Sequence, residues 1–424
     1  MKKNTNKNMQ KRIEKICIEA NNCANMLASA STSLKNDALN KIADRIDYDR
    51  KKILEENLKD LNDAKNNNLP DAMIDRLILN KNRIKDMTNS VRKISKLPDP
   101  IGTEIRKWER PNGLNISQIR VPIGVIGIIY ESRPNVTVDA SSLSLKSGNS
   151  IILRGGSESF NSSKAIVESI HGALQNTSIP IGSVQMIDTI DREAVGVMLS
   201  MNKYIDLIVP RGGKSLIAKV QMDSKIPTLA HLDGLCHTYV DTDADEDMSI
   251  KIAINAKMRR TGICGATETL LCHNNIRNSI LPKIIDGLIS SGCEIRGDEE
   301  VKKLNKKILK AKEEDWSTEY LDSIISIKLV SNVNEAIRHI EKYGSNHTDS
   351  IITENKNTAE IFLEKVNSAI VLHNASTQYA DGGEFGMGAE MGIATGKLHA
   401  RGPVGLEQLT TYKYQIRGNG QVRP

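Results

Sequence analysis

From Gln118 onward, short apolar runs alternate with amphipathic helical segments, and this alternation restricts the possible folds more than any other feature of the sequence. The runs recur roughly every 20–35 residues, a spacing that predicts βαβ units and a parallel, doubly wound α/β sheet. Ligands bind such sheets beyond the carboxyl ends of the strands. The expected strands of this region are residues 121–130, 150–154, 183–187, 204–210 and 227–232.

A second α/β region is expected from about residue 237 to residue 385. The Gly-rich stretch 381–396 is typical of a loop between elements. The C-terminal run that begins at Thr410 is rich in β-branched and aromatic residues, which favours a strand that pairs with another strand. The strand candidates of the second region are residues 237–241, 269–274, 327–331, 350–353 and 369–374.

The first 100 residues carry a helical pattern instead. Between residues 71 and 94, apolar side chains recur at a spacing of three to four and form one stripe. Pro98 and Pro100 then end the helical region. The stripe consists of Met73, Leu77, Ile84, Met87, Val91 and Ile94.

Length and charge restrict the class of protein. A chain of 424 residues is long enough for two or three domains, each with its own core. The net charge is +6, and residues 1–100 account for the excess with 21 basic against 14 acidic residues. Because acids are interspersed there and aromatic residues make up only 3% of the chain, we interpret this region as a solvated helical surface. We expect no nucleic-acid partner.

The chain carries no sign of export or of membrane insertion. The first 20 residues contain many charges and no apolar core of the kind that a signal peptide has. The longest apolar stretch, residues 121–130, has about half the length that a bilayer requires. Six cysteines without a CxxC motif predict free thiols in a reducing compartment. We therefore expect a cytoplasmic protein.

Cys264 has the local features of a nucleophile. It lies between Gly262 and Gly265, close to Arg259 and Arg260, and just before an expected strand. Cationic neighbours and free backbone N–H groups in a tight loop stabilise a thiolate, and small flanking residues let a substrate carbonyl approach. A buried structural thiol is the alternative, and it is the interpretation that we give to the other five cysteines.

Two turns between a strand and a helix are further candidates. Asn135, after the strand that ends near Tyr130, carries an amide that can donate to an oxyanion, or it is the N-cap of the following helix. In residues 152–159, a strand ends at Arg154 and two glycines precede a helix, which suits contacts with a nucleotide. An ordinary βα turn explains this second motif equally well.

Three other possible sites, a P-loop, a dinucleotide fingerprint and a zinc site, are not supported by the residue spacing. The segment Arg211–Ser215 ends like a P-loop, but the first glycine of that motif is replaced by Ile208. Glycines 386, 388 and 392 do not open a βαβ unit, as a dinucleotide fingerprint would. The histidines match no zinc spacing, so we predict no metal site.

The order of these motifs resembles the aldehyde dehydrogenase superfamily. More closely, the chain resembles the gamma-glutamyl phosphate reductase family from about residue 71 to residue 414. The blocks that carry this resemblance are VPIGVIGIIYESRPNVTVDASSLSLKSGNSIILRGGSES, IDLIVPRGGKSL, VNEAIRHIEKYGSNHTDSII and HARGPVGLEQLTTYKY.

The resemblance implies NADPH-dependent reduction of L-glutamyl 5-phosphate to L-glutamate 5-semialdehyde and phosphate, the second step of proline biosynthesis. Cys264 would form a thioester, and Asn135 would donate to the oxyanion. A functional association with glutamate 5-kinase is also implied, as is a homo-oligomer of two or more subunits. Implied cofactor-binding residues are Arg154, Ser157, Glu158, Arg211, Gly212, Gly213, Glu384 and Phe385. Candidates for substrate binding are Glu131, Arg133, Arg259 and His347.

One departure from the superfamily bears on the reaction. Hydrolytic aldehyde dehydrogenases carry a glutamate upstream of the cysteine, whereas the corresponding region here reads LAHLDGLCHTYV, with Asp233 as its one acid. An acyl-phosphate reductase needs no base to activate water, because phosphate leaves as an anion. A hydrolytic aldehyde dehydrogenase and a nucleotide-binding module without redox chemistry are the alternatives.

The resemblance also implies the domain organisation. We expect an NADP-binding domain of residues 1–103 and 120–232 and a catalytic domain of residues 233–386. Residues 104–119 and 387–424 would supply an oligomerisation hairpin and the C-terminal tail.

Overall fold

The computed structural model describes residues 2–423, and it describes side-chain burial for all of these except residues 2–6, 71 and 72. The chain divides into two compact units. Unit 1 consists of residues 2–230, 386–392 and 404–423, and unit 2 consists of residues 231–385 and 393–403. The assignment of cofactor binding to one region and catalysis to the other stays a prediction.

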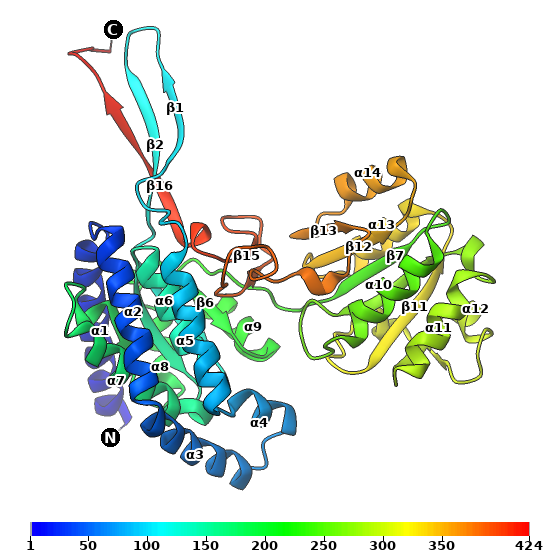
Figure 1. Ribbon diagram of the computed structural model, residues 1–424, viewed down its shortest axis with the longest axis horizontal. Coiled ribbons are helices and arrows are strands. Elements are labelled where there is room, and N and C mark those ends of the chain that lie inside the picture. The colour runs from blue at the N-terminus through cyan, green and yellow to red at the C-terminus, as the bar shows by residue number, and fades with distance from the viewer. Residues whose placement is uncertain (1, 424) are drawn as a thin grey trace. The chain divides into compact units, whose positions relative to one another are not determined.

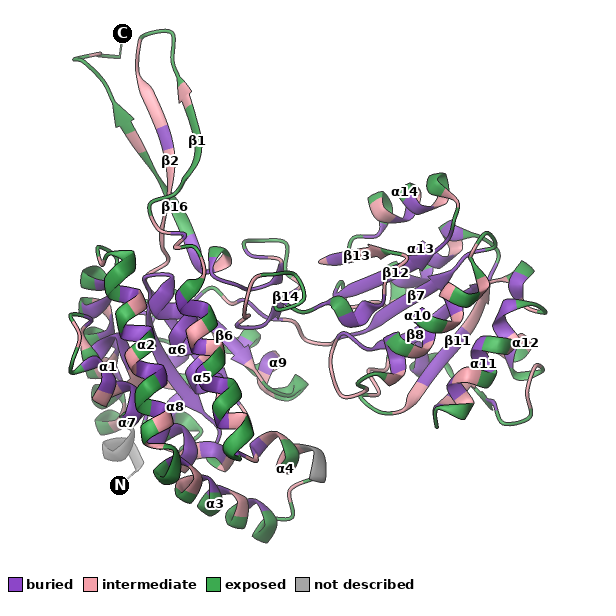
Figure 2. Cartoon of the chain, in the orientation of Figure 1, coloured by how far each residue is buried: buried purple, intermediate pink, exposed green. Residues whose placement is uncertain are grey.

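Unit 1 contains a four-stranded parallel sheet in the order β5-β4-β3-β6, with β4 and β3 as its inner strands. Its central strands are fully buried, as Figure 2 shows, so they form near-continuous apolar runs. The strands are β3 (Val125–Tyr130), β4 (Ser150–Gly155), β5 (Val184–Met186) and β6 (Leu207–Arg211).

Helices surround this sheet, and the predicted N-terminal helical region is confirmed (Figure 1). Ser31 and Asn80 cap two of these helices by accepting a hydrogen bond from a backbone N–H in the first turn. The first five helices are α1 (Lys2–Leu27), α2 (Thr32–Tyr48), α3 (Arg50–Asn66), α4 (Asp71–Leu77) and α5 (Lys81–Lys96). The helices between the strands are α6 (Pro134–Lys146), α7 (Phe160–Leu174), α8 (Glu193–Leu199) and α9 (Lys214–Asp223).

Unit 2 contains a seven-stranded parallel sheet in the order β10-β9-β11-β8-β7-β12-β13. The strands are β7 (Cys236–Val240), β8 (Thr267–His273), β9 (Glu294–Gly297), β10 (Leu309–Lys310), β11 (Ile324–Val330), β12 (Thr348–Ile352) and β13 (Ile370–His373). The helices are α10 (Glu246–Met258), α11 (Ile280–Ser290), α12 (Glu299–Lys302), α13 (Val333–Tyr343) and α14 (Lys356–Lys365). Two short strands, β14 (Ile393–Ala394) and β15 (Gly402–Pro403), form a separate antiparallel pair.

A three-stranded antiparallel sheet completes unit 1. The C-terminal strand β16 (Thr410–Arg417) pairs with β2 (Asn115–Pro122), which pairs with β1 (Glu104–Glu109) on its other side (Figure 1). The predicted C-terminal strand is therefore confirmed. β1 and β16 are both edge strands, and most of their side chains are exposed.

Two expected strands are corrected. The apolar run 121–130 is divided between β2 and β3, because Gly124 adopts φ +134° and the Asp206 carboxylate accepts the Val125 N–H at 2.8 Å. Residues 227–232 do not form a strand. They make one isolated parallel bridge, Thr228 with Ile208, beside a proline that has no N–H to extend a ladder.

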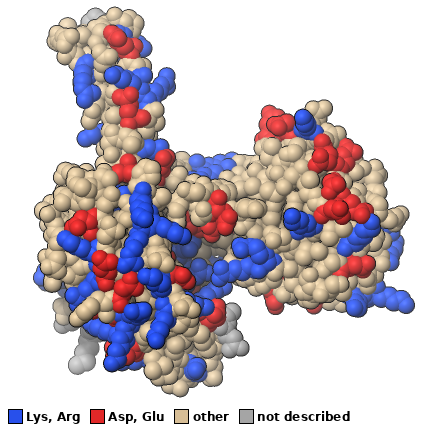
Figure 3. Space-filling model, in the orientation of Figure 1, with Lys and Arg blue, Asp and Glu red and all other residues tan. Residues whose placement is uncertain are grey.

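The surface of the helical region agrees with its predicted interpretation. On the face that Figure 3 shows, basic and acidic side chains are interspersed. Ion pairs such as Lys52 with Glu168 and Arg92 with Asp44 join them. Among the described residues, no helix combines the length and the apolar character that crossing a bilayer would require.

Candidate active site

Cys264 lies in the tight turn between α10 and β8, at the amino end of the unit 2 sheet. His231 precedes the neighbouring strand β7, and His347 directly precedes β12 on the far side of β7. The three residues therefore meet at the amino ends of three adjacent parallel strands. This group lies at the end of the sheet opposite to the carboxyl ends of the strands, and the expectation of ligand binding at the carboxyl ends stays a prediction.

Small residues hold the Cys264 turn in place. A Cβ built on Gly234 would lie 2.4 Å from the Cys264 carbonyl oxygen, so the two backbones pack in direct contact. The Cys236 thiol donates to the same carbonyl at 3.0 Å. Cys264 also packs against the small apolar cluster of Ile370, Ala380 and Ile393. This packing supports the turn and leaves Cys264 half-buried.

The other five cysteines are buried free thiols, as predicted. Burial raises the pKa of Cys17 and of Cys293 to about 12, and it also raises the pKa of Cys272. A neutral, inaccessible thiol is a poor nucleophile. Of the six cysteines, all of which the structure describes, Cys264 alone is partly open to solvent.

Two histidines stand beside Cys264. Its Sγ and one ring nitrogen each of His231 and His347 all lie within 4.8 Å of one another. The two rings contact each other edge to face with their centroids 5.0 Å apart. Sequence reasoning identified His347 as a candidate but missed His231, because nothing in the chain around His231 indicates which strand lies next to β7.

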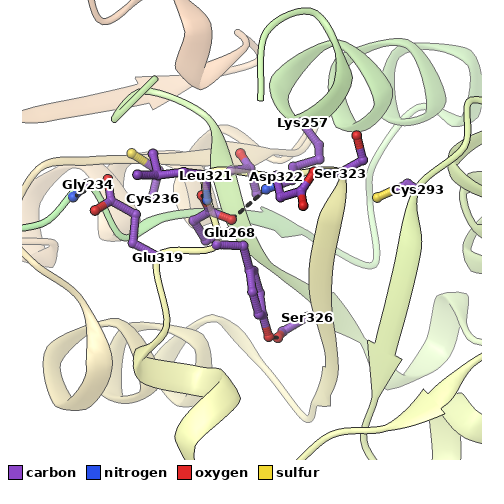
Figure 4. A network of polar contacts seen from close by, with 12 residues as sticks. Gly234, Cys236, Lys257, Glu268, Cys293, Glu319, Leu321, Asp322, Ser323 and Ser326 are labelled. Carbon is purple, nitrogen blue, oxygen red and sulfur yellow. Dashed lines mark hydrogen bonds and ion pairs between the residues drawn. The ribbon is translucent and has the colours of Figure 1, made fainter. Parts of the chain in front are cut away.

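Two carboxylates near this turn were also missed. The Gly234 N–H donates to Glu319 at 3.0 Å, and Glu319 follows the short helical turn before β11. Glu268, on β8, forms a buried ion pair with Lys257 of α10 at 2.5 Å (Figure 4). Burial raises the pKa of Glu268 to about 7, against the opposing effect of Lys257. No local motif marks either residue.

Arg259 and Glu384 line one shallow pocket of about 150 Å³ in unit 2, together with Asn255, Gln378 and Tyr379. The Arg259 Nε donates to Gln378 at 3.2 Å. The chain therefore brings together one residue predicted to bind substrate and one predicted to bind cofactor. Phe385, next to Glu384, has an exposed side chain.

A second group of predicted residues lies in unit 1, at the carboxyl ends of β3, β4 and β6. Glu131 follows β3, and its carboxylate accepts the Gly213 N–H at 2.8 Å at the start of α9. Arg211 ends β6, and Gly212 follows it. A Cβ on Gly212 would lie 2.4 Å from the Glu131 carboxylate, so a larger residue there would displace the end of the Glu131 side chain. The Glu131 side chain is therefore tied to the glycine loop by a hydrogen bond.

The loop after β4 carries Arg154, Ser157 and Glu158. Glu158 accepts hydrogen bonds from the Ser132 N–H at 2.7 Å and from the Ser132 hydroxyl at 3.0 Å, which ties this loop to the one after β3. The Arg154 side chain is buried and donates to the backbone carbonyls of Gly155, Ile190 and Asp191. Burial lowers the pKa of Arg154.

Asn135 is not an N-cap, so that interpretation is wrong. Helix α6 begins at Pro134, whose fixed φ suits the first helical position, and Arg133 is the N-cap. The Asn135 amide donates to the Asp139 carboxylate one turn later at 3.1 Å. An amide nitrogen carries two hydrogens, so this bond orients the group and leaves one donor for another partner.

Comparison with known proteins relates nearly the whole chain to one family. The aldehyde dehydrogenase family model matches residues 3–292. The gamma-glutamyl phosphate reductase of Paramagnetospirillum magneticum is 54% identical over 405 residues, which cover 96% of each chain. That of Brucella suis is 54% identical over 398 residues, or 94% of each.

Solved structures give the same relationship. The crystal structure of gamma-glutamyl phosphate reductase from Thermotoga maritima has a TM-score of 0.95 and 46% identity, and the match covers 97% of this chain and 99% of that one. An acetylating aldehyde dehydrogenase from Geobacillus thermoglucosidasius has a TM-score of 0.70 at 15% identity, over 99% of each chain. At that identity the likeness concerns the fold alone.

Proposed function

Because the chain belongs to the aldehyde dehydrogenase family and, within it, to the gamma-glutamyl phosphate reductases, it is an oxidoreductase, and we propose that it reduces L-glutamyl 5-phosphate to L-glutamate 5-semialdehyde with NADPH. The reaction releases phosphate and is the second step of proline biosynthesis. A covalent Cys264 thioester is the intermediate of the proposed mechanism.

The observation that carries the mechanism is the setting of Cys264. It is the one half-exposed thiol among six described cysteines, and it sits in a turn held by the glycine at position 234. Its thiolate attacks the acyl carbon, a carbon–sulfur bond forms, and the carbon–oxygen bond to phosphate breaks. Phosphate leaves as an anion, so this step requires no general acid.

Asn135 and the backbone N–H of Cys264 are the proposed donors to the oxyanion that forms when the thioester is reduced. The hydrogen bond from Asn135 to Asp139 supports this role, since it fixes the orientation of the amide before substrate binds. Collapse of the tetrahedral state breaks the carbon–sulfur bond and returns the thiolate.

The aldehyde dehydrogenase family uses NAD or NADP, and the residues of unit 1 fit such a group. The glycine loop after β6 leads into the start of α9, a place that suits an anion, and there the Gly213 N–H already donates to the Glu131 carboxylate. Bound NADPH would supply the hydride. We assign its contacts to Arg154, Ser157, Glu158, Arg211, Gly212, Gly213, Glu384 and Phe385; the preference for NADPH rests on the family.

The substrate's charged groups need partners of opposite charge. Arg259 is our candidate for a carboxylate, because its guanidinium lines a pocket at the end of α10, the helix that leads into the Cys264 turn. Glu131, Arg133 and His347 remain further candidates, although the bond of Glu131 to the glycine loop favours a role near the cofactor.

A hydrolytic aldehyde dehydrogenase is the second candidate function, and one observation favours it. Glu319 accepts a hydrogen bond from the N–H of Gly234, the residue that packs on Cys264. A carboxylate is therefore present near the cysteine, although the upstream glutamate of the hydrolytic enzymes is missing from the sequence. If Glu319 activated water, turnover would not require phosphate, and Glu319→Gln would abolish it.

The protein acts on a small molecule, and we propose further that it works in the cytoplasm as a homo-oligomer, with a functional association to glutamate 5-kinase. The exposed edge strands β1 and β16 support the proposal of an oligomer, since free edges are normally covered. The association with the kinase rests on the chemistry of the substrate, because an acyl phosphate hydrolyses readily.

The test is NADP⁺ reduction with glutamate 5-semialdehyde, with and without phosphate. We expect phosphate-dependent turnover in the wild type and at least a 1,000-fold loss in Cys264→Ala, since removing a catalytic nucleophile can cost about 10⁶-fold in kcat. Cys293→Ala removes a buried thiol and is the matched control. Turnover that does not depend on phosphate would overturn the proposal in favour of hydrolysis.

A further inference from the structure

We propose that His231, Cys264 and His347 form a binding site for a divalent zinc-like cation, and that the cation occupies the thiolate and so blocks the enzyme reversibly. The site itself stands on geometry alone. Only its inhibitory effect rests on the proposed function, in which Cys264 is the nucleophile.

The donor set matches zinc. A thiolate and two imidazoles are ligands that Zn²⁺ prefers, and a site with three protein ligands keeps a fourth position for water. Tetrahedral coordination at the usual bond lengths puts donor atoms about 3.3–3.6 Å apart. The three donor atoms here lie within 4.8 Å of one another, so a contraction of about 1 Å would complete the arrangement.

The second nitrogens of the rings are held as they are in metal sites. His231 Nδ1 lies 2.8 Å from the Ile393 carbonyl oxygen, which can only accept, so Nδ1 is the donor and the neutral ring keeps its lone pair on Nε2. His347 Nδ1 lies 2.9 Å from the Thr348 hydroxyl. Ligating histidines usually donate their other N–H to a carbonyl or a similar acceptor, and this bond fixes the tautomer and the direction of the ring.

The backbone also fixes the three ligands. They stand at the amino ends of β7, β8 and β12, which are neighbours in one hydrogen-bonded sheet. All three belong to unit 2, so the site needs no other part of the chain. His347 is buried, whereas His231 and Cys264 are half-buried. A cation can therefore enter from the side of the latter two residues and find the third already in position.

The nearest other thiol is not a competing ligand. Cys236 donates its S–H to the Cys264 carbonyl at 3.0 Å, so its proton is already engaged. Cys236 also approaches His347 Nδ1 at 3.7 Å, the nitrogen opposite to the one that we assign to the cation. Among the described residues, no other group of three histidine, cysteine or acidic side chains has this geometry.

The chemistry of inhibition follows from coordination. A cation displaces the thiol proton and takes the sulfur lone pair that would attack the acyl carbon. No bond to carbon forms and nothing is oxidised, so a chelator would restore the free thiol. We expect inhibition to be competitive with the acyl substrate, since both need the same sulfur.

The test uses Co²⁺ as a spectroscopic probe on the full-length enzyme after treatment with a chelator. We expect a thiolate-to-cobalt charge-transfer band in the wild type, displaced by Zn²⁺. Cys264→Ser should lose the band, and His231→Ala and His347→Ala should each weaken Co²⁺ binding by about 10- to 100-fold or more. His373→Gln removes an exposed histidine of unit 2 outside the group, and Cys293→Ala removes a buried thiol; both should bind like the wild type.

A second measurement guards against loss of folding in the variants. Zn²⁺ should slow alkylation of Cys264 by iodoacetamide at least tenfold in the wild type and should have little effect in His231→Ala. A charge-transfer band that persists in Cys264→Ser, or absence of any band in the wild type, would overturn the site. Co²⁺ binding at Cys264 without loss of turnover would support the metal site and would refute the proposed role of Cys264 as the nucleophile.

Discussion

The α-carbon of Gly234 is so close to Cys264 that a Cβ there would lie 2.4 Å from the Cβ and from the carbonyl oxygen of Cys264. A Cβ atom does not come this close to an atom that it is not bonded to, so Gly234→Ala must push the Cys264 turn away. A displacement of about 1 Å at a reacting atom can cost about 100-fold in rate, and we expect kcat to fall by at least that factor. Steady-state kinetics and a thermal melt together separate this effect from unfolding. The control is Gly196→Ala, where a Cβ meets nothing within 4 Å; equal losses in both variants would contradict the argument.

Iodoacetamide should modify Cys264 before any other cysteine of the folded enzyme. Cys264 is half-exposed, whereas the remaining five thiols are buried and therefore shielded from the reagent. Burial also raises the pKa of Cys17 and Cys293 to about 12, so these thiols stay protonated at neutral pH. Peptide mass spectrometry after brief labelling would give the order of modification. Earlier labelling of any buried cysteine would show that the exposure of Cys264 does not govern its reactivity.

Replacement by alanine should weaken NADPH binding much more at Gly212 than at Gly213, its neighbour in the loop after β6. A Cβ at Gly212 would lie 2.4 Å from the Glu131 carboxylate and 2.8 Å from the Leu216 side chain, whereas a Cβ at Gly213 meets the same carboxylate at 3.7 Å, an ordinary contact. We expect Gly212→Ala to weaken NADPH binding about tenfold or more, or about 1.4 kcal/mol, because the Glu131 carboxylate that accepts the Gly213 N–H must move. Gly213→Ala, the matched variant, should change it much less. Fluorescence titration with NADPH would measure both, and similar affinities in the two variants would contradict the assignment of this loop.

The buried Lys257–Glu268 pair should make stability depend on pH (Figure 4). Burial raises the pKa of Glu268 from 4.5 to about 7, so between these values the folded protein binds more protons at this group than the unfolded chain does. The contribution of Glu268 is therefore fully present below pH 4.5 and is lost as the pH rises through about 7. Its slope approaches about 1.4 kcal/mol per pH unit.

Glu268→Gln should remove this slope from urea unfolding measured between pH 5 and 7. The control is Glu299→Gln, because Glu299 is exposed and its hydrogen bond to Lys310 lowers its pKa, so it titrates below that range. An unchanged slope in Glu268→Gln would show that other groups dominate the pH dependence.

The exposed apolar side chains of β16 should hold subunits together. Tyr414 is 55% exposed and Ile416 is 60% exposed on an edge strand, and both would place apolar surface in water in an isolated subunit. We expect the double change Tyr414→Asp, Ile416→Asp to dissociate the oligomer, so that light scattering measures a lower molar mass than for the wild type. Leu58→Asp alters an equally exposed residue of α3 and should leave the mass unchanged. A wild-type monomer would refute the proposed oligomer.

Local sequence patterns predicted most of the secondary structure and singled out one candidate nucleophile, Cys264. Apolar periodicity identified the helices before Pro98 and most strands of both parallel sheets, because burial of one face or of both faces leaves a repeat along the chain. It failed at residues 121–130, where the run hides a break at Gly124, since apolar character is the same on both sides of a change in backbone direction. Small neighbours and nearby arginines were enough to single out Cys264.

The partners of Cys264 were decided only by the tertiary structure. His231 and His347 are distant from Cys264 in sequence, and both meet its turn because β7 lies between β8 and β12 in the sheet. Glu319 precedes β11, on the other side of β8, and reaches the N–H of Gly234. Strand order is set by which strands exchange hydrogen bonds and by how the helices cover the sheet, and both are properties of the whole fold. A residue's own neighbours along the chain determine whether it forms a strand; they do not determine which strand lies beside it. The sequence therefore determined the thiol and its turn, and the sheet determined the imidazoles and carboxylates around them.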